Sequence, residues 1–185
     1  MTAPTFVDTN IFVYARDPRD AAKQASAAEW IVNYWRDRSG RTSVQVLSEY
    51  YYNVTHKLTP KVASADAWDD VQALFEWRPQ PLDGALLERA RDIEQRWRLV
   101  WWDSMIVAAA QMQGCAILLT EDLQDGAVFV GVTVRNPFTH NVNEPTAAYA
   151  VHPVVASRHR GRGRPRKSLS VSNRPSQQAA GEKSP

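Results

Sequence analysis

Short runs of strand-forming residues alternate along this chain with longer stretches of helical periodicity, and this alternation constrains the fold most. Residues 115–119 are continuously apolar, as in strands that are buried on both faces of a parallel sheet. Neighbouring parallel strands need long crossover connections, which helices usually supply. The chain is therefore predicted to be an α/β protein with three layers, in which helices flank a mostly parallel sheet.

Other strands are predicted from similar local signals. Residues 5–7 and 41–44 form two short β-type runs, and residues 127–134 form the last one. Residues 78–82 contain two prolines, so this segment could form only a short or edge strand.

Helices are predicted between these runs. In residues 20–38, Ala27, Trp30 and Tyr34 recur at helical spacing, and Gly40 is interpreted as closing that helix. Ser43 and Asp83 are expected to cap two further helices. The remaining predicted helices follow from apolar residues at the same spacing, and begin near Ser64 and at Asp103.

The charge of the chain divides it into two parts. Residues 1–156 carry 14 Lys and Arg against 19 Asp and Glu, which gives −5, whereas residues 157–185 carry 8 against 1, which gives +7. The second part is rich in Arg, Ser, Pro and Gly and has few apolar residues to bury, so it is expected to be disordered. We therefore expect a folded domain over residues 1–138, a linker over 139–156 and a basic tail over 157–185.

Several features favour the cytoplasm as the location of the chain. No apolar run is long enough to span a membrane, and the first ten residues do not resemble a signal peptide. The one cysteine, Cys115, lies in an apolar run and is interpreted as a buried core residue in a reduced compartment.

Four acidic residues are expected to meet at one edge of the sheet. Asp8 follows the first strand, Asp122 follows the strand at residues 115–119, and Glu49 lies early in the helix after the second strand. Asp103 is expected at a strand-to-helix junction. In open parallel sheets, ligands bind beyond the carboxyl ends of the strands.

Carboxylates packed together repel each other, and a divalent cation such as Mg²⁺ or Mn²⁺ removes that conflict because it prefers oxygen ligands. Such ions also activate water and neutralise phosphate charge during phosphodiester cleavage. Simpler interpretations remain open at this point: Asp8 and Asp103 could cap helices, Glu49 could be solvated, and Asp122 could belong to an ordinary turn.

Four segments resemble the PIN-domain ribonucleases, and among them the VapC-type toxins of bacterial toxin–antitoxin pairs. They occur in the family's order: FVDTNI at residues 6–11, SVQVLSEY at 43–50, WDSMIVAAA at 102–110 and ILLTEDL at 117–123. The resemblance implies a five-stranded parallel sheet and a metal-dependent endoribonuclease. It also implies that Asp8, Glu49, Asp103 and the more variable Asp122 are the catalytic, metal-binding acids.

The same resemblance implies two supporting residues and several partners. Asn10 would orient groups beside Asp8, and Thr120 would help to bind water or phosphate. Proteins of this kind cleave RNA, are silenced by a cognate antitoxin and commonly form homodimers. The long basic tail departs from such toxins, which end soon after the last strand.

The tail has its own candidate function. Its basic residues Arg160, Arg162, Arg164, Arg166 and Lys167 are interspersed with glycine and proline, and RGRP at residues 162–165 resembles the core of an AT-hook. Such a peptide would lie in the minor groove of A·T-rich DNA. A simpler interpretation is a tail that binds any polyanion, RNA included, by charge alone.

Other classes of function are less well supported. A receiver domain would need a lysine after the fifth strand, and no lysine follows Val128 before the tail. A haloacid-dehalogenase-type phosphatase would need a second aspartate where Asn10 stands, and dinucleotide binding would need a glycine-rich loop after the first strand. A non-catalytic DNA-binding protein that acts through the tail remains the alternative function.

Overall fold

The structure is a computed structural model that describes residues 3–140. The expected linker extends beyond this range, and the expected basic tail, with its AT-hook-like segment, lies wholly outside the described residues. No helix in residues 3–140 is both long and apolar enough to cross a membrane.

Five strands form a single sheet in the order β2-β1-β3-β5-β4. They are β1 (Thr5–Val7), β2 (Gly40–Arg41), β3 (Ile117–Leu119), β4 (Val128–Phe129) and β5 (Val132–Arg135). β1 pairs in parallel with β2 and β3, and β3 pairs in parallel with β5, whereas β4 is antiparallel to β5. The predicted mostly parallel sheet is confirmed, as is the number of strands that the resemblance implied.

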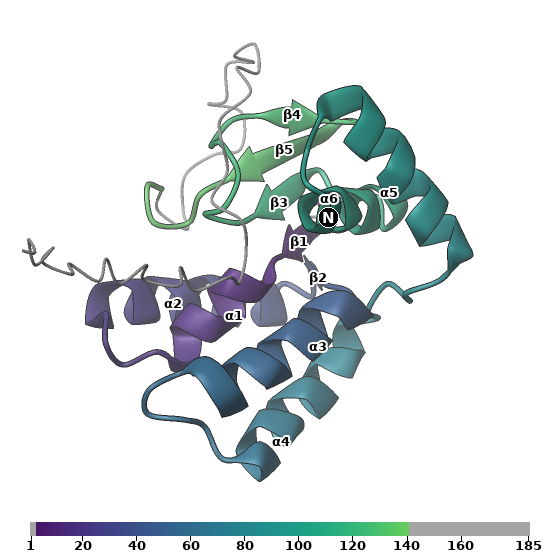
Figure 1. The fold of residues 1–185 in the computed structure, drawn as a ribbon. Coiled ribbons are helices and arrows are strands. Elements are labelled where there is room, and N and C mark those ends of the chain that lie inside the picture. The colour runs from purple at the N-terminus through teal and green to yellow at the C-terminus, as the bar shows by residue number, and fades with distance from the viewer. Residues whose placement is uncertain (1–2, 141–185) are drawn as a thin grey trace, which may run out of the picture.

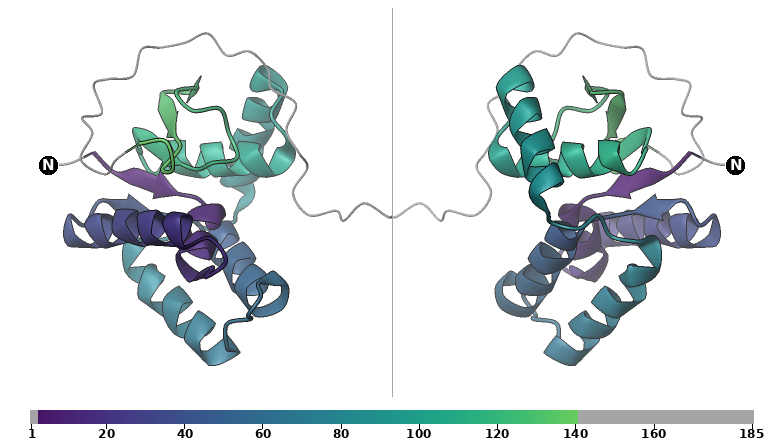
Figure 2. Two further views of the ribbon diagram at one scale, coloured as in Figure 1. Left: turned by 90° about the vertical axis from the view of Figure 1, so that its left-hand side faces the viewer. Right: turned by 90° about the vertical axis from the view of Figure 1, so that its right-hand side faces the viewer.

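Helices cover both sides of this sheet, which makes three layers (Figure 1). One side carries α1 (Thr9–Arg16), α2 (Ala21–Arg36), α3 (Val44–Tyr52) and α4 (Ser64–Leu74). The other side carries α5 (Gly84–Trp97) and α6 (Trp101–Met112), and the two side views in Figure 2 show β1 between these layers. Two short helical turns, η1 (Asn53–Lys57, a π-helix) and η2 (Phe75–Trp77, a 3₁₀ helix), follow α3 and α4.

Helices α2, α3 and α5 each begin at a polar residue whose side chain accepts a hydrogen bond from the first turn. Asp20 accepts from Lys23 N before α2, Ser43 from Val46 N before α3, and Asp83 from Leu86 N before α5. These bonds satisfy backbone donors that have no partner inside a helix, so they fix where each helix starts. The two caps predicted at Ser43 and Asp83 are confirmed.

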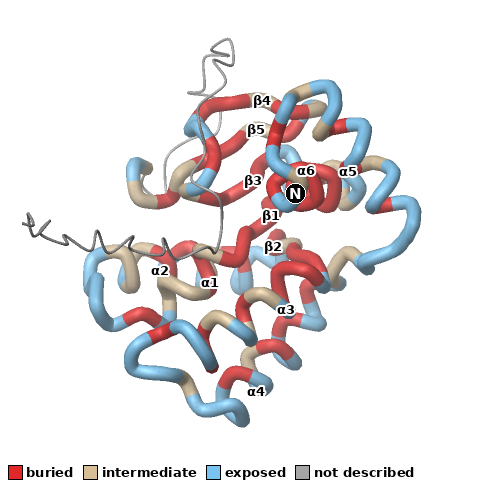
Figure 3. Tube along the Cα trace, viewed as in Figure 1, coloured by how far each residue is buried: buried red, intermediate tan, exposed pale blue. Residues whose placement is uncertain are grey.

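The residues at the centre of the molecule are buried (Figure 3), and most of them are apolar. All three residues of β1 and of β3 are buried, and α6 is buried on every side from Asp103 to Ala110 because it lies between the sheet and α5. Cys115 is also buried, as predicted, and burial raises the pKa of its thiol to about 12. Its thiol is therefore protonated and unreactive at neutral pH.

The last predicted strand, residues 127–134, is in fact a hairpin. Val130 and Gly131 both have positive φ angles, +48° and +86°, so the chain reverses between β4 and β5. A two-residue turn with positive φ at both positions matches the twist of antiparallel strands. The apolar residues on either side of the turn gave no sign of the reversal, because Val rarely adopts this conformation.

Other boundaries also differ from the prediction. The second strand occupies Gly40–Arg41 rather than residues 41–44, and the segment at 78–82 contributes only a single bridge, between Gln80 and Ser43. Gly40 does not close α2, which ends at Arg36 with Asp37 as its C-cap and is followed by Arg38, a residue with a positive φ of +53°. A Cβ at Gly40 would lie 2.6 Å from the ring of Trp77, so this glycine is required by close packing.

Candidate active site at the carboxyl edge of the sheet

Asp8 directly follows β1 and is 1% exposed. One carboxylate oxygen accepts a hydrogen bond from Thr9 N at 2.6 Å, and Asp8 is also the N-cap of α1. The other oxygen accepts from the Thr120 hydroxyl at 2.8 Å and from the Asn10 amide at 3.4 Å. Asp8 thus caps a helix and also takes part in a polar cluster that capping alone does not require.

Asn10 connects the ends of β1 and β3. Its amide nitrogen lies 2.9 Å from the Thr120 hydroxyl oxygen and 3.0 Å from Asp122 Oδ2. Asp8 N also donates to the Leu119 carbonyl at 3.1 Å, which fixes the two strand ends relative to each other. Parallel pairing of β1 with β3 therefore brings Asp8, Asn10, Thr120 and Asp122 together, although more than 100 residues separate the two segments.

Glu49 approaches this cluster from α3. Its carboxylate accepts hydrogen bonds from the Thr9 hydroxyl at 3.2 Å and from the Gln45 amide at 2.9 Å. Gln45 lies one helical turn before Glu49, so it holds that carboxylate from the same face of α3. Glu49 therefore points toward the end of β1, and the alternative of a solvated helix residue is not supported.

Asp103 is the third residue of α6 and is 4% exposed. No strand precedes it, because residues 98–100 form a connection between α5 and α6, so the expected strand-to-helix junction is wrong. Its N-cap is Val100, so Asp103 does not cap the helix. α6 leads through a short turn into β3 and packs against it, so its first turn lies near the carboxyl end of that strand.

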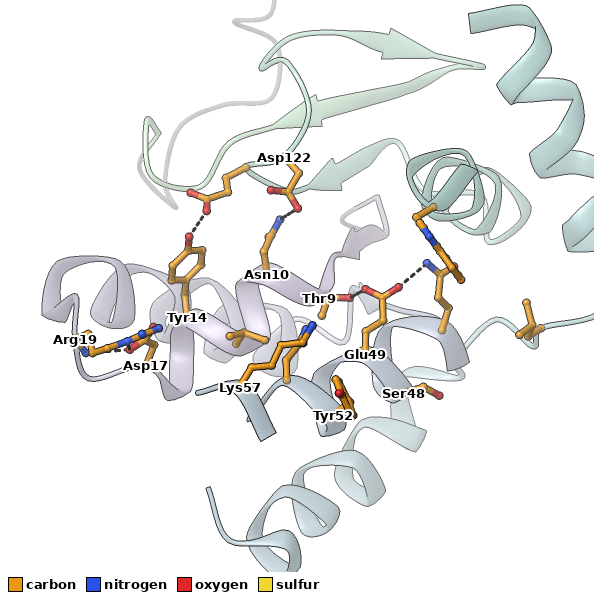
Figure 4. Close-up of a pocket in the computed structure, with 16 residues that line it drawn as sticks. Thr9, Asn10, Tyr14, Asp17, Arg19, Ser48, Glu49, Tyr52, Lys57 and Asp122 are labelled. Carbon is orange, nitrogen blue, oxygen red and sulfur yellow. Dashed lines mark hydrogen bonds and ion pairs between the residues drawn. The ribbon is translucent and has the colours of Figure 1, made fainter. Parts of the chain in front are cut away.

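A cavity of about 720 Å³ opens beside these residues (Figure 4). Glu49, Asp122, Asn10 and Thr9 line it, and α6 contributes Trp102, the neighbour of Asp103. Figure 4 shows Glu49 and Asp122 approaching this space from α3 and from the segment after β3. Of the four acids that the sequence singled out, Glu49 and Asp122 line this cavity, whereas Asp8 and Asp103 are not among its lining residues.

Several residues of this site were not singled out from the sequence. Thr9 and Gln45 orient Glu49, and their spacing from Asp8 and Glu49 could have suggested that role. Lys23 pairs with Glu121 at 2.6 Å, and the Tyr14 hydroxyl donates to the same carboxylate. Glu121 therefore anchors the segment after β3 to α1 and α2, and no feature of the sequence pairs these three residues.

The side-chain atoms of Asp8, Asn10, Thr120 and Asp122 that could coordinate a metal ion are all oxygens, and oxygen ligands suit a hard divalent cation. Asn10 Oδ1 is buried and accepts no hydrogen bond from the part of the chain that is described, so one more oxygen is available beside Asp8 and Asp122. Within residues 3–140, however, no group of three or more His, Cys, Asp or Glu side chains stands in an arrangement that could hold a metal ion as it is.

Fold and cavity together define an α/β protein with an acidic site at the carboxyl edge of its sheet. The sequence model of the PIN domain matches residues 5–124, which is more than half of the chain. The chain therefore belongs to the PIN domain family, whose members are nucleases and generally use divalent metal ions.

Among solved structures, the chain resembles VapC20 of Mycobacterium tuberculosis, which is described as a toxin that cleaves the sarcin–ricin loop. The two share 19% sequence identity with a TM-score of 0.47, and the match covers 70% of this chain and 98% of that chain. No curated protein sequence matches this chain significantly.

Proposed function

We propose that this chain is a metal-dependent endoribonuclease, the toxin of a VapC-type toxin–antitoxin pair. The observation that carries the proposal is the cluster of Asp8, Asn10 and Asp122, joined by hydrogen bonds at the end of β1 and β3, with Glu49 facing it across Thr9. Membership of the PIN domain family supports a nuclease. Asp8 and Asp122 lie in two of the segments that resemble this family, residues 6–11 and 117–123.

In this proposal Asp8, Glu49, Asp103 and Asp122 hold Mg²⁺ or Mn²⁺. The ion would supply activation of a water molecule and neutralisation of charge on the phosphate. Asn10 and Thr120 keep the Asp8 carboxylate in place through the bonds described above. Thr9 and Gln45 turn the Glu49 carboxylate toward the same point, so that the acids are positioned before substrate arrives.

The experiment is an RNA-cleavage assay with purified protein that is free of any partner. We expect cleavage of single-stranded or looped RNA in the presence of Mg²⁺ or Mn²⁺ and its loss with EDTA. Cleavage that survives chelation would contradict a metal-dependent mechanism.

The toxin assignment needs a separate test. Expression of the chain should slow bacterial growth, and co-expression of a small protein encoded beside it, as the antitoxin, should restore growth. We propose in addition that the chain forms a homodimer, as the resemblance implied, and gel filtration tests this. Unimpaired growth despite soluble, active protein would refute the toxin but leave the nuclease intact.

A further inference from the structure

Two large aromatic side chains lie exposed on the wall of the acidic cavity. Tyr52 is 52% exposed and comes from the end of α3, and Trp102 is 50% exposed and comes from the first turn of α6. Most aromatic side chains of the domain pack into its core, as Phe6, Phe12, Trp30 and Trp77 do. Two rings left in contact with solvent at one cavity are candidates for contacts with a ligand.

Each ring lies beside one of the proposed metal-binding acids. Tyr52 is three residues after Glu49 on α3, and residues at this spacing are neighbours on a helix surface. Trp102 immediately precedes Asp103. A part of the substrate that contacts these rings would therefore lie close to the phosphodiester bond that the proposed nuclease cleaves.

A stacking contact orients the Tyr52 ring. Its ring stacks on that of His56, with centroids 4.7 Å apart and an angle of 16° between the planes. His56 belongs to the π-helical turn η1, an irregularity that is common at functional sites. The His56 Nδ1 atom in turn lies 2.7 Å from the Thr55 hydroxyl oxygen and 3.2 Å from the Tyr52 carbonyl oxygen, so the His56 ring is joined to the backbone of Tyr52.

A cation accompanies the aromatic rings. The Lys57 ammonium group lies 5.2 Å from the centre of the Tyr52 ring and lines the cavity, and Figure 4 shows its side chain extending into that space. Other cations near the cavity are engaged in ion pairs, Arg19 with Asp17 and Lys23 with Glu121. Lys57 forms no ion pair within residues 3–140, so its charge can meet an anionic ligand.

We propose that Tyr52, Trp102 and Lys57 form a binding subsite for unpaired nucleotides, in which the two rings stack on bases next to the cleaved bond and Lys57 binds a phosphate. The proposal rests on the proposed ribonuclease function and names residues outside the acidic cluster that would hold its substrate. Stacking on aromatic rings is how proteins hold unpaired bases, whereas bases within a duplex are already stacked on each other.

Binding is tested by fluorescence anisotropy with a short, labelled 2′-O-methyl oligoribonucleotide, which resists cleavage, in Mg²⁺. We expect Tyr52→Ala and Trp102→Ala each to weaken binding by about tenfold. Tyr52→Phe and Trp102→Phe keep a ring and should stay close to wild type. Lys57→Ala should lower the slope of the logarithm of the binding constant against the logarithm of salt concentration by about one.

Trp68→Ala is the matched control, because Trp68 is 49% exposed and lies on α4 outside the cavity. Its affinity for the oligonucleotide should be that of wild type. The same oligonucleotide with abasic residues should bind wild type and both alanine variants equally, since it has no bases to stack. Circular dichroism checks that each variant is folded.

Three outcomes would overturn the proposal. One is an unchanged affinity of Tyr52→Ala and Trp102→Ala, and another is an equal effect of these changes on the abasic probe. The third is that Tyr52→Ala and Trp102→Ala still bind RNA but no longer bind the protein encoded beside this chain. That result would mean that the two rings contact a protein partner. Cleavage is measured separately, so a wild type that binds as expected but cleaves no RNA would refute the nuclease and not the subsite.

Discussion

Asp8 serves two functions at once, and this makes its replacement informative. It is the N-cap of α1 and also the acid to which Thr120 and Asn10 donate. Asp8→Asn keeps the shape and one accepting oxygen but removes the charge that a cation requires. Because asparagine has a single accepting oxygen, its amide nitrogen would face either Thr9 N or the donors of Thr120 and Asn10, so the substitution also costs stability.

We expect Asp8→Asn to lower metal-dependent cleavage by more than about 100-fold, because even residues that only orient metal ligands cost 10–100-fold when replaced. Thermal unfolding should still be cooperative, with the free energy of unfolding lowered by roughly 1–2 kcal/mol. Asp92→Asn, an exposed acid on α5, is the control and should alter neither quantity. Activity near wild type in Asp8→Asn would mean that this aspartate is only a helix cap.

Gly40 is the other single residue with a clear physical role. A Cβ there would meet the Trp77 ring at 2.6 Å, and that ring is itself fixed by contacts with Phe12 and Trp35. We expect Gly40→Ala to lower the free energy of unfolding by about 1–3 kcal/mol, as overpacking does. Urea denaturation measures this, with an unchanged slope.

Gly84→Ala provides the comparison for Gly40→Ala. No atom lies within 4 Å of a Cβ at Gly84, and the residue opens α5. It should be neutral or slightly stabilising, because alanine restricts the unfolded chain more than glycine. Equal effects of the two substitutions would show that contact with Trp77 does not determine the cost at Gly40.

At the scale of elements, α3 is the helix that the proposed site depends on most. It carries Glu49 and Gln45, ends at Tyr52, and begins at the Ser43 cap, whose hydroxyl accepts from Val46 N at 3.2 Å. The start of α3 also determines which residues face the cavity, since each further residue rotates the side chain by about 100° around the helix. A change at the cap therefore affects stability and the position of Glu49 together.

Ser43→Ala should lower the free energy of unfolding by about 1 kcal/mol, because it leaves one backbone donor of α3 without a partner. Hydrogen exchange should show faster opening of the first turn of α3 than of the rest of the helix. Ser64→Ala, at the exposed first residue of α4, is the control and should change little. Uniform exchange along α3 in Ser43→Ala would argue against a capping role.

At the scale of the whole molecule, the division of charge gives the last prediction. Residues 1–156 carry −5 and residues 157–185 carry +7, so the proposed nuclease domain is poorly suited on its own to attract a phosphate backbone. We propose that the basic tail raises affinity for nucleic acid without supplying catalysis.

Truncation after Ala156 should therefore weaken binding and flatten its salt dependence, by a slope of about 0.7–0.9 for each phosphate that the tail neutralises in the full chain. Cleavage of a short RNA at saturating concentration should change little. The AT-hook interpretation predicts in addition that the isolated tail prefers A·T-rich duplex over G·C-rich duplex and RNA. Equal affinity of the tail for the two duplexes and for RNA would support binding by charge alone. An unchanged salt dependence after truncation would refute both the AT-hook and binding by charge.

Local sequence was sufficient for much of the fold because the physical causes are local. The helical spacing of apolar residues depends on neighbours along the chain, and so do the caps at Ser43 and Asp83. The same holds for the apolar run that contains β3 and for the aspartates that follow strands. The hairpin at Val130 and Gly131 was missed, because a valine with positive φ is tolerated only where surrounding structure imposes it.

Tertiary structure alone decided how the proposed site is assembled. The direction of Glu49 follows from the packing of α3 against α1, which places it opposite Thr9, and the meeting of Asn10 with Asp122 follows from the parallel register of β1 and β3. The exposure of Trp102 beside the buried Asp103 depends on which face of α6 the sheet and α5 cover. The sequence determines which residue types are available, but these contacts join segments distant along the chain and exist only when the layers pack.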